Sequence, residues 1–258
     1  MQLKAFCQVT IAPMRAEPND RAEMISQLLF GELVEIIQKN ENWIKIETLY
    51  DKYQGWIDYK HILELTETEF NDLNFPPNYV SSSFDYADLN KIPFPLTIGA
   101  EIRYKSNDEI FLSKKLFKFN GELIKSENFG RNKIIEIAYN YLNTPYLWGG
   151  KSTFGIDCSG FTQMCFKMCN YFLPRDANQQ ANIGEVLGFL EEAEPGDLAF
   201  FENKEGKIIH VGIILGNRKI IHAHGKVQID SLDNTGIYNA ELKKYTHQLR
   251  IIKKIIGV

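Results

Sequence analysis

The sequence predicts an all-β amino-terminal part followed by an α+β carboxy-terminal part. Before about residue 128, short apolar runs alternate with polar, turn-like breaks, a pattern typical of small antiparallel β domains. After that point, two stretches with apolar residues at helical spacing precede several apolar runs of strand length. Helices followed by strands indicate an α+β fold. The 258 residues suffice for two or three domains that each bury a core.

Composition and charge exclude several functional classes. Hydrophobic residues make up 44% and charged residues 24% of the chain, as in ordinary globular proteins. The net charge of −4 offers no basic field, so we expect no nucleic-acid partner. No apolar run reaches the roughly 20 residues of a membrane-spanning helix, and the start lacks the apolar core of a signal peptide. We therefore expect a protein without a membrane span. Its expected location is the cytoplasm, or the periplasm or the outside of the cell if a leader has been removed. We also expect a monomer.

Residues 1–65 predict the strands of a small barrel. Apolar runs begin at Leu33, Trp43 and Gly55, and polar, turn-like segments separate them at the spacing of a meander. The order of these residues resembles that of bacterial SH3-like domains. The resemblance rests on Val34, Ile36, Asn42, Trp43, Ile46, Tyr53, Gly55, Trp56 and Ile57.

Residues 66–128 predict a second, divergent SH3-like barrel. A stretch with paired prolines and three consecutive serines connects it to the first barrel. Runs that begin at Phe94, Ile110 and Phe117 then alternate like strands around turns. The alternative is one long insertion that wraps over its neighbour.

Residues 129–258 form the predicted α+β part. Apolar residues recur at helical spacing from Ile134 to Leu142, and Pro145 follows the end of this helix. A second helical stripe begins at Cys158 and runs to Phe172. Predicted strands follow at 198–201, 208–215, 219–223 and 249–256.

Cys158 is the candidate nucleophile among the four cysteines. These are too few and too unevenly placed for a disulfide framework, so we expect reduced thiols. The N–H groups and the positive dipole end of the helix that starts at Cys158 favour a thiolate, the nucleophilic form. Cys165 and Cys169 lie on the apolar stripe, where we expect core residues. A metal site of these three cysteines is the alternative, but it lacks a Cys-x-x-Cys pair, so we expect no metal and no cofactor.

Two histidines are candidates for the base and the group that orients it. A nucleophilic cysteine needs a base within hydrogen-bond reach, and the base needs a third group that holds its tautomer. His210 lies in an apolar strand, and its alternative role is that of a core histidine. If Gly216-Asn217-Arg218 is a three-residue hairpin loop, His222 lies opposite Gly212 and shares a face with His210. A two-residue loop would place it on the other face. His224 is expected at the rim.

Six short motifs follow one another in the α+β part. They are Thr144-Pro145-Tyr146-x-Trp148-Gly149-Gly150, Gly155-x-Asp157-Cys158-Ser159-Gly160-Phe161, Pro174-Arg175-Asp176-x-x-x-Gln180, Pro195-Gly196-Asp197-Leu198, His210-Val211-Gly212-Ile213 and Ile221-His222-Ala223. Their order and spacing resemble the NlpC-type cell-wall cysteine peptidases (NlpC/P60). With the SH3-like region, the whole chain resembles the γ-D-glutamyl-diamino-acid endopeptidases that trim peptidoglycan stem peptides. The resemblance implies a papain-like α+β fold for residues 129–258.

The resemblance also implies roles for the residues selected above. Cys158 is then the nucleophile, His210 the general base and later the general acid, and His222 the group that orients His210. The backbone N–H of Cys158 at the helix start is the expected oxyanion donor. Further residues on family positions that line the substrate cleft are Tyr146, Trp148, Asp157, Ser159, Arg175 and Asp176.

Each cleft residue also has a structural alternative. Asp157 is a candidate helix cap, Ser159 a candidate solvated residue of the first turn, and Trp148 a candidate core residue. Ala177 follows the Arg-Asp pair where many relatives carry serine. The missing hydroxyl puts one substrate hydrogen bond in doubt.

The amino-terminal barrel is expected to bind the free amine of the substrate, as the resemblance implies. An acid and a tyrosine suit an ammonium group. Glu23 is the first candidate for the acid, Glu17 the second, and Tyr53 is the candidate tyrosine. The alternative is that these charged loop residues are simply solvated.

We therefore predict a cysteine endopeptidase that cuts the γ-D-glutamyl–diamino acid bond of murein stem peptides of the form L-Ala-γ-D-Glu-diamino acid. An amidase or acyltransferase acting on another murein peptide bond is one alternative. A non-catalytic wall-binding protein is the other, and the joint presence of a thiol and two imidazoles argues against it. The sequence leaves open whether the diamino acid is diaminopimelate or lysine.

Overall fold

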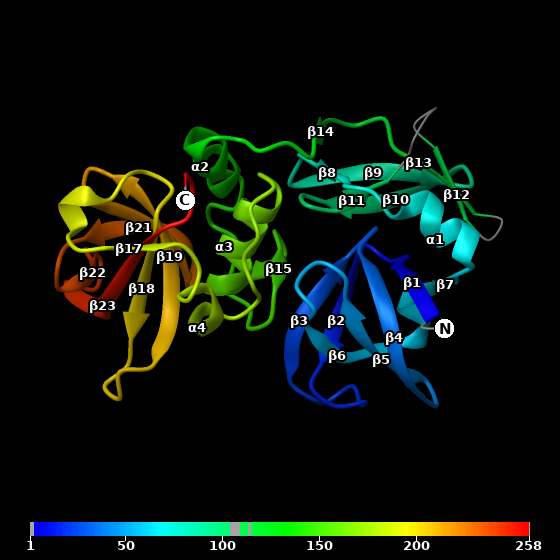
Figure 1. Cartoon of the computed structure of the whole chain (residues 1–258), viewed down its shortest axis with the longest axis horizontal. Helices are drawn as coiled ribbons and strands as arrows, with labels where there is room; N and C mark the ends of the chain where they lie inside the picture. Colours follow the sequence, from blue (N-terminus) through cyan, green and yellow to red (C-terminus); the bar gives the residue numbers. More distant parts are fainter. Residues whose placement is uncertain (1–2, 104–108, 113–114, 258) are drawn as a thin grey trace. The chain divides into compact units, whose positions relative to one another are not determined.

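The computed structural model describes residues 3–103, 109–112 and 115–257 (Figure 1). The contacts within the chain group it into two compact units. The first comprises Met1–Ser126 together with Trp148–Thr153, and the second comprises Glu127–Leu147 and Phe154–Val258. The three domain ranges expected from the sequence stay predictions, because the contacts define two units rather than three.

The first unit begins with a small antiparallel β structure. Seven strands pair in the order β3-β2-β6-β5-β4-β1-β7. They are β1 (Leu3–Cys7), β2 (Ile11–Arg15), β3 (Met24–Leu29), β4 (Leu33–Asn40), β5 (Trp43–Thr48), β6 (Gln54–Asp58) and β7 (Ile62–Leu65), with the short helix η1 (Tyr59–His61) before β7. The runs predicted at Leu33, Trp43 and Gly55 are thereby confirmed as strands. Alternate residues of β5 are buried, so one face supplies the core and the other meets water.

The rest of the first unit consists of one helix and two small sheets. Helix α1 (Glu67–Leu73) is capped by Thr66, whose hydroxyl accepts from the Glu69 N–H while the Glu69 carboxylate accepts from the Thr66 N–H. One sheet has the order β10-β9-β13-β12 and the other β11-β8-β14. The strands are β8 (Asn78–Val80), β9 (Phe84–Leu89), β10 (Ile92–Thr97), β11 (Glu101–Ile102), β12 (Glu109–Leu112), β13 (Lys115–Lys118) and β14 (Leu123–Ile124).

These small sheets share an apolar core with the amino-terminal strands. Phe6 and Phe30 from the first strands lie in one buried cluster with Leu96 and Phe117 from the later ones. The rings of Phe30 and Phe117 are 5.1 Å apart between centroids. The identification of residues 66–128 as a second barrel stays a prediction, and its strands bury their apolar side against the first.

The segment 148–153 belongs to the first unit although it lies within the stretch of peptidase motifs. It carries β15 (Lys151–Ser152). The backbone N–H of Lys151 donates to Gln27 Oε1 at 2.8 Å, and its buried ammonium group lies 3.0 Å from the Glu32 carboxylate. Gly149 has φ +77°, and a Cβ atom there would lie 2.4 Å from the carbonyl oxygen of Met24. Only glycine tolerates both the left-handed backbone and this close approach.

The second unit has the predicted order of helices followed by strands. The helices are α2 (Arg131–Asn140), α3 (Cys158–Lys167), α4 (Ala177–Gln180) and η2 (Leu190–Glu192). The strands are β16 (Gly155–Ile156), β17 (Glu185–Leu187), β18 (Leu198–Glu202), β19 (Ile208–Gly216), β20 (Lys219–His224), β21 (Lys226–Leu232), β22 (Gly236–Asn239) and β23 (Lys244–Lys254). Helix α3 ends before Cys169, which therefore lies in the following turn rather than on the helix. The left-handed Asn170, with φ +62°, stops the helix there, and Cys169 is nevertheless fully buried.

The large sheet of the second unit closes on itself. Its order is β17-β23-β18-β19-β20-β21-β22, and the long strand β23 pairs with β22 as well as with β18. Six strands thus form a ring. The apolar side chains on one face form a buried cluster of Ala199, Phe201, Ile214, Ile220, Leu232, Ile237 and Ile252. The sequence predicted β18, β19, β20 and β23, but not β17, β21 and β22.

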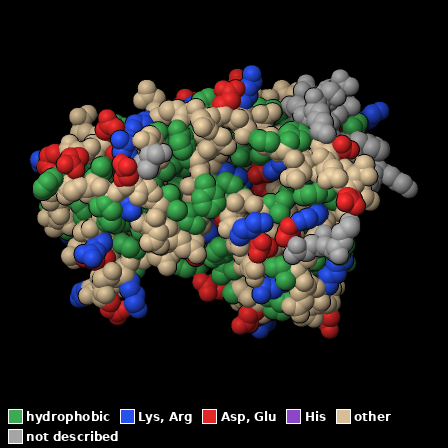
Figure 2. All heavy atoms as spheres, in the orientation of Figure 1, with side chains coloured by type: hydrophobic (Ala, Val, Ile, Leu, Met, Phe, Trp, Pro, Cys, Tyr) green, Lys and Arg blue, Asp and Glu red, His purple; other side chains and the backbone are tan. Residues whose placement is uncertain are grey.

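No helix in the described part of the chain is long and apolar enough to cross a membrane. On the face seen in Figure 2, basic and acidic side chains are interspersed rather than gathered into one field of a single sign. Such a surface provides no long-range attraction for a polyanion on that face.

We expect Lys151→Met to destabilise the first unit by about 3–5 kcal/mol, because it leaves the buried Glu32 carboxylate without its cation. The double variant Lys151→Met/Glu32→Gln should recover part of the loss, since no unpaired charge then remains. Urea unfolding followed by circular dichroism measures both effects. Lys207→Met, which breaks an exposed pair with Glu205, is the matched control and should leave the midpoint nearly unchanged. A loss no larger than that of the control would contradict the assignment.

Candidate active site

Cys158 is the first residue of α3 in the second unit. The preceding residue, Asp157, has an extended backbone, and its Oδ1 accepts from the Gly160 N–H at 2.7 Å. This is a side-chain cap of the kind that starts helices. The thiol is 6% exposed. The cap therefore fixes a nearly buried sulfur at the end of the helix where backbone N–H groups are unpaired.

A buried arginine holds the residues on either side of Cys158. The Arg175 guanidinium donates to Asp157 Oδ1 at 3.0 Å and to Oδ2 at 2.6 Å. It also donates to Ser159 Oγ at 2.9 Å. Arg175 is 2% exposed, so the ion pair lies out of water and has the two-pronged geometry that suits guanidinium and carboxylate. Asp157 is thus a helix cap and an ion-pair partner, and Ser159 is buried rather than solvated.

The electrostatic environment keeps Cys158 in the thiol form. Burial raises the pKa of the Cys158 thiol to about 12, and the Asp157 charge adds to the effect. The backbone N–H groups of Val211 and Ser159 and the Arg175 charge act in the opposite direction. The helix start was expected to favour a thiolate, and the backbone N–H groups do act in that direction, but burial is the largest effect on the pKa of this thiol and raises it. The sulfur therefore needs a base to take its proton.

His210 and His222 share one face of the barrel sheet. Gly212 pairs with His222, as the three-residue-loop hypothesis requires. The connection is in fact a two-residue turn at Asn217 and Arg218, both with positive φ. A bulge between Ile214 and Gly216 adds the extra residue that restores the register. The predicted register is confirmed, and the predicted loop length is wrong.

The two imidazoles form a hydrogen-bonded chain that ends on a carboxylate. His210 Nε2 lies 2.8 Å from His222 Nδ1, and His222 Nε2 lies 3.0 Å from Asp230 Oδ2. His210 is 4% exposed and His222 fully buried. Burial alone would raise the pKa of the Asp230 carboxyl, but the hydrogen bonds it accepts outweigh burial and lower that pKa. The Val211 N–H that points at the Cys158 sulfur follows His210 directly, so the thiol lies at the strand segment that carries this histidine.

The sequence did not identify Asp230 as a site residue. It lies on β21, a strand that was not predicted. The alternation of Val227 and Ile229 with polar residues after Gly225 was the available signal for a third strand. Strand β21 pairs with β20, and this pairing places Asp230 beside Ile220 and Gln228 beside His222.

Two further histidines adjoin the chain. His247, on β23, stacks on His210 with ring centroids 4.0 Å apart and planes at 21°. His224 lies edge-on to His247 at 4.8 Å and is exposed, in keeping with its expected rim position. Burial and the neighbouring imidazoles hold the pKa of His210 well below its usual value and lower that of His247 to about 3. Both effects favour neutral rings. No local pattern marks His247, because it lies 37 residues beyond His210 in the sequence.

Three of these imidazoles, those of His210, His222 and His247, offer nitrogen atoms within 4.8 Å of one another. A metal ion bound to all three would have to replace one of the two hydrogen bonds of His222, because both ring nitrogens of His222 already take part in one. The arrangement fits hydrogen bonding as it stands. The expectation that the reaction needs no metal or cofactor stays a prediction.

Two other predicted residues, Tyr146 and Asp176, also lie in the second unit. Tyr146 is half-buried, and its phenol pKa is raised by burial first and then by the neighbouring Cys158 and Asp157 charges. It therefore lies close to the sulfur. Asp176 is the N-cap residue of α4, and its backbone N–H donates to Gln179 Oε1. Ala177 is the first residue of that helix.

The remaining predicted residues lie in the first unit. Trp148 is 60% exposed, so the core alternative is wrong, and its indole Nε1–H donates to Glu23 Oε1 at 2.7 Å. Glu23 itself is exposed. Tyr53 is half-buried next to the barrel core, and its backbone N–H donates to Thr48 Oγ1. The structure thus brings Glu23 and Trp148 together.

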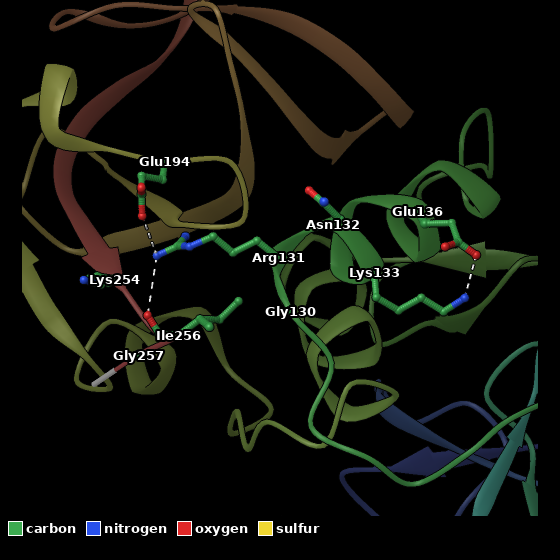
Figure 3. Close-up of a pocket in the computed structure, with 9 residues that line it drawn as sticks. All are labelled: Gly130, Arg131, Asn132, Lys133, Glu136, Glu194, Lys254, Ile256 and Gly257. Atoms are coloured by element: carbon green, nitrogen blue, oxygen red, sulfur yellow. Dashed lines mark hydrogen bonds and ion pairs between the residues drawn. The ribbon is translucent and has the colours of Figure 1, made fainter.

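A pocket at the start of α2 is a structural feature rather than a second site (Figure 3). Arg131 lines it, and its guanidinium reaches Glu194, the Ile256 carbonyl and the buried Asp197 carboxylate. Lys133 pairs with Glu136 at 2.6 Å. Arg131 therefore joins α2 to neighbouring segments, and Lys133 is paired within the helix.

Comparison with known proteins matches two parts of the chain to families. The model of the NlpC/P60 family matches residues 143–246, and that of the bacterial dipeptidyl-peptidase SH3 domain matches residues 14–62. The chain is 32% identical over 235 residues to a gamma-D-glutamyl-L-lysine dipeptidyl-peptidase of Bacillus subtilis (strain 168), covering 84% of this chain and 78% of the relative. It is 27% identical over 259 residues to dipeptidyl-peptidase 6 of Lysinibacillus sphaericus, covering 90% and 92%.

A solved structure supports the fold. The crystal structure of an NlpC/P60 family protein from Bacillus cereus ATCC 10987 matches with a TM-score of 0.80 and 20% identity, covering 98% of this chain and all of the other. Together with the capped cysteine helix and the histidine-bearing sheet, these relationships establish the class. The chain belongs to the NlpC/P60 family of cysteine peptidases, with a bacterial SH3 domain ahead of a papain-like α+β domain.

Proposed function

We propose that this cysteine peptidase hydrolyses the γ-D-glutamyl–diamino acid bond of peptidoglycan stem peptides in cell-wall turnover or recycling. The observation that carries the proposal is the buried chain from His210 through His222 to Asp230. Its first member, His210, lies on the strand that also meets the Cys158 sulfur. The name of the Bacillus subtilis relative supports the choice of bond. The cytoplasmic location expected from the sequence remains part of this proposal.

The chemistry follows from the neutral state of both reacting groups. The Cys158 sulfur attacks the amide carbonyl while its proton passes to the imidazole of His210. The backbone N–H of Cys158 is the proposed donor to the oxyanion. His210 then gives the proton to the leaving amine, and water releases the acyl group from the sulfur. Because the thiol pKa is high, the proton leaves as the attack proceeds rather than beforehand.

The first unit supplies the proposed partner for the free amine of L-Ala. The Glu23 carboxylate is exposed, and the Trp148 indole donates to one of its oxygens. A carboxylate held in one orientation suits an ammonium group better than a mobile one does, because less side-chain entropy is lost on binding. Tyr53 remains the proposed tyrosine of this subsite.

We expect the enzyme to release the free diamino acid from L-Ala-γ-D-Glu-diaminopimelate and from its lysine counterpart, and mass spectrometry of the products identifies the bond. Cys158→Ala should lose at least about 10³-fold in rate, because the nucleophile is gone. N-acetylation of the substrate should lower kcat/KM at least about tenfold, since a neutral amide cannot pair with Glu23.

Cys165→Ala is the matched control, because it removes a buried thiol from the same helix without touching the site. It should retain near-wild-type activity. Cleavage at another stem-peptide bond would contradict the proposed specificity. Equal rates on the free and the acetylated peptide would contradict the assignment of Glu23 as the partner of the substrate amine.

The pKa shift of His210 makes a prediction for the pH profile. Only neutral His210 accepts the thiol proton, and its pKa is held well below 6.5 by burial first and then by His222, His247 and His224. We therefore expect kcat/KM to stay near its maximum at pH 6.5 and to fall only as the pH decreases through the lowered pKa. His247→Phe keeps a stacked ring but removes one of the imidazoles that disfavour protonation of His210, so its acid limb should move to higher pH. His61→Gln, in the first unit, should leave the limb unmoved. An acid limb at pH 6.5 or above in the wild type would contradict the neutral-pair mechanism.

A further inference from the structure

Asp230 is a buried carboxylate fixed in one orientation. It is 8% exposed. Asn239 Nδ2 donates to its Oδ1 at 3.0 Å and to its Oδ2 at 3.2 Å, and Gln228 Nε2 donates to Oδ2 at 2.8 Å. The Leu242 N–H donates to Asn239 Oδ1 at 2.8 Å, which fixes the direction in which this amide points. The oxygen that faces His222 therefore has a set position and is an acceptor.

An acceptor at that position determines which nitrogens of the two histidines carry protons. The Asp230 carboxylate only accepts, so the proton between it and His222 must be on His222 Nε2. In a neutral ring the other nitrogen, Nδ1, then carries a lone pair and accepts from His210 Nε2. His210 Nδ1 is consequently left with a lone pair. One carboxylate thus sets two tautomers in series.

We propose that Asp230 is a positioning residue that sets the tautomers of His222 and His210 and so leaves His210 Nδ1 able to take the Cys158 proton. The step in which that proton moves rests on the function proposed above. The tautomers themselves do not, because in neutral rings they follow from the hydrogen bonds that Asp230 makes. Asp230 touches neither the thiol nor the substrate in this account.

The opposite tautomers would disable the base. If His222 carried its proton on Nδ1, it would donate to His210 Nε2, and neutral His210 would carry its own proton on Nδ1. That nitrogen would then be a donor with no lone pair for the thiol proton. A wrong tautomer of this kind costs about 10⁴-fold in kcat in the serine-protease triad, where an aspartate holds the catalytic histidine directly.

The first test reads the tautomers without substrate. In protein labelled with ¹⁵N in its histidines, long-range ¹⁵N–¹H spectra at pH 8 should report the Nε2–H form for both His210 and His222. Either ring in the Nδ1–H form would overturn the proposal. Failure of the peptidase assay would leave this measurement intact, and failure of this measurement would leave the assigned bond intact.

The second test changes the acceptor. In Asp230→Asn, the fixed Asn239 amide favours the new carbonyl oxygen on its own side. When the Gln228 amide turns over, its oxygen accepts from the new NH₂, which then faces His222 Nε2. We expect His222 and His210 to switch to the Nδ1–H form and kcat to fall about 10²–10⁴-fold with KM nearly unchanged. Native tautomers with an unchanged kcat would overturn the proposal.

A compensating variant separates the tautomer from a general loss of structure. In Asp230→Asn/Asn239→Asp, the new carboxylate at position 239 accepts from the NH₂ of residue 230, which turns the carbonyl oxygen back toward His222. The Nε2–H tautomers and at least tenfold of the lost kcat should return. Asp233→Asn is the matched control, because this aspartate bonds Tyr245 and turn N–H groups instead of a histidine. Its kcat should equal that of the wild type, and a double variant no better than Asp230→Asn would contradict the mechanism.

Discussion

The ion pair between Arg175 and Asp157 is the interaction on which the nucleophile's position depends. Asp157 must cap α3 one residue before Cys158, and a carboxylate so close to a buried sulfur opposes ionisation of the thiol. The buried guanidinium occupies both carboxylate oxygens and also holds Ser159. A buried carboxylate without this partner would be strongly destabilising. The same pair therefore fixes the helix start and limits how far the thiol pKa rises.

Because the thiol stays protonated, a histidine has to take its proton before or during the attack. Neutral His210 is a competent base only if its free lone pair faces the thiol, and a neutral imidazole has two tautomers to choose from. His222 alone cannot decide between them, since a neutral imidazole at this position also has two tautomers. The choice has to end on a group that can only accept, and among the described hydrogen bonds of His222 that group is Asp230. The burial of Cys158 and His210 therefore requires the hydrogen-bonded chain that runs from His210 through His222 to Asp230.

The sequence predicts those features of the site that depend on local pattern. The helix start at Cys158 and the register that places His222 opposite Gly212 follow from spacing along short segments. Other features depend on contacts between segments far apart in the sequence. His247 meets His210 only because β23 closes the ring of strands, and Lys151 meets Glu32 across 119 residues. The pKa of the thiol combines both kinds of effect, because helix position is local whereas desolvation depends on everything packed around the sulfur.

The closure of the barrel also sets the environment of the base. His247 pairs with Ile237 along β22 and β23, and next to this pair Gly236 has φ +145°. A Cβ atom at Gly236 would lie 1.8 Å from the His247 carbonyl oxygen, so only glycine lets the two strands approach here. With the strands paired, the His247 ring stacks on His210, where burial and a neighbouring imidazole both disfavour a protonated base. The close approach of Gly236 to the His247 backbone therefore allows β22 and β23 to pair and the sheet to close. Closure brings the His247 ring onto His210, and this stacking favours the neutral His210 that the proposed reaction requires.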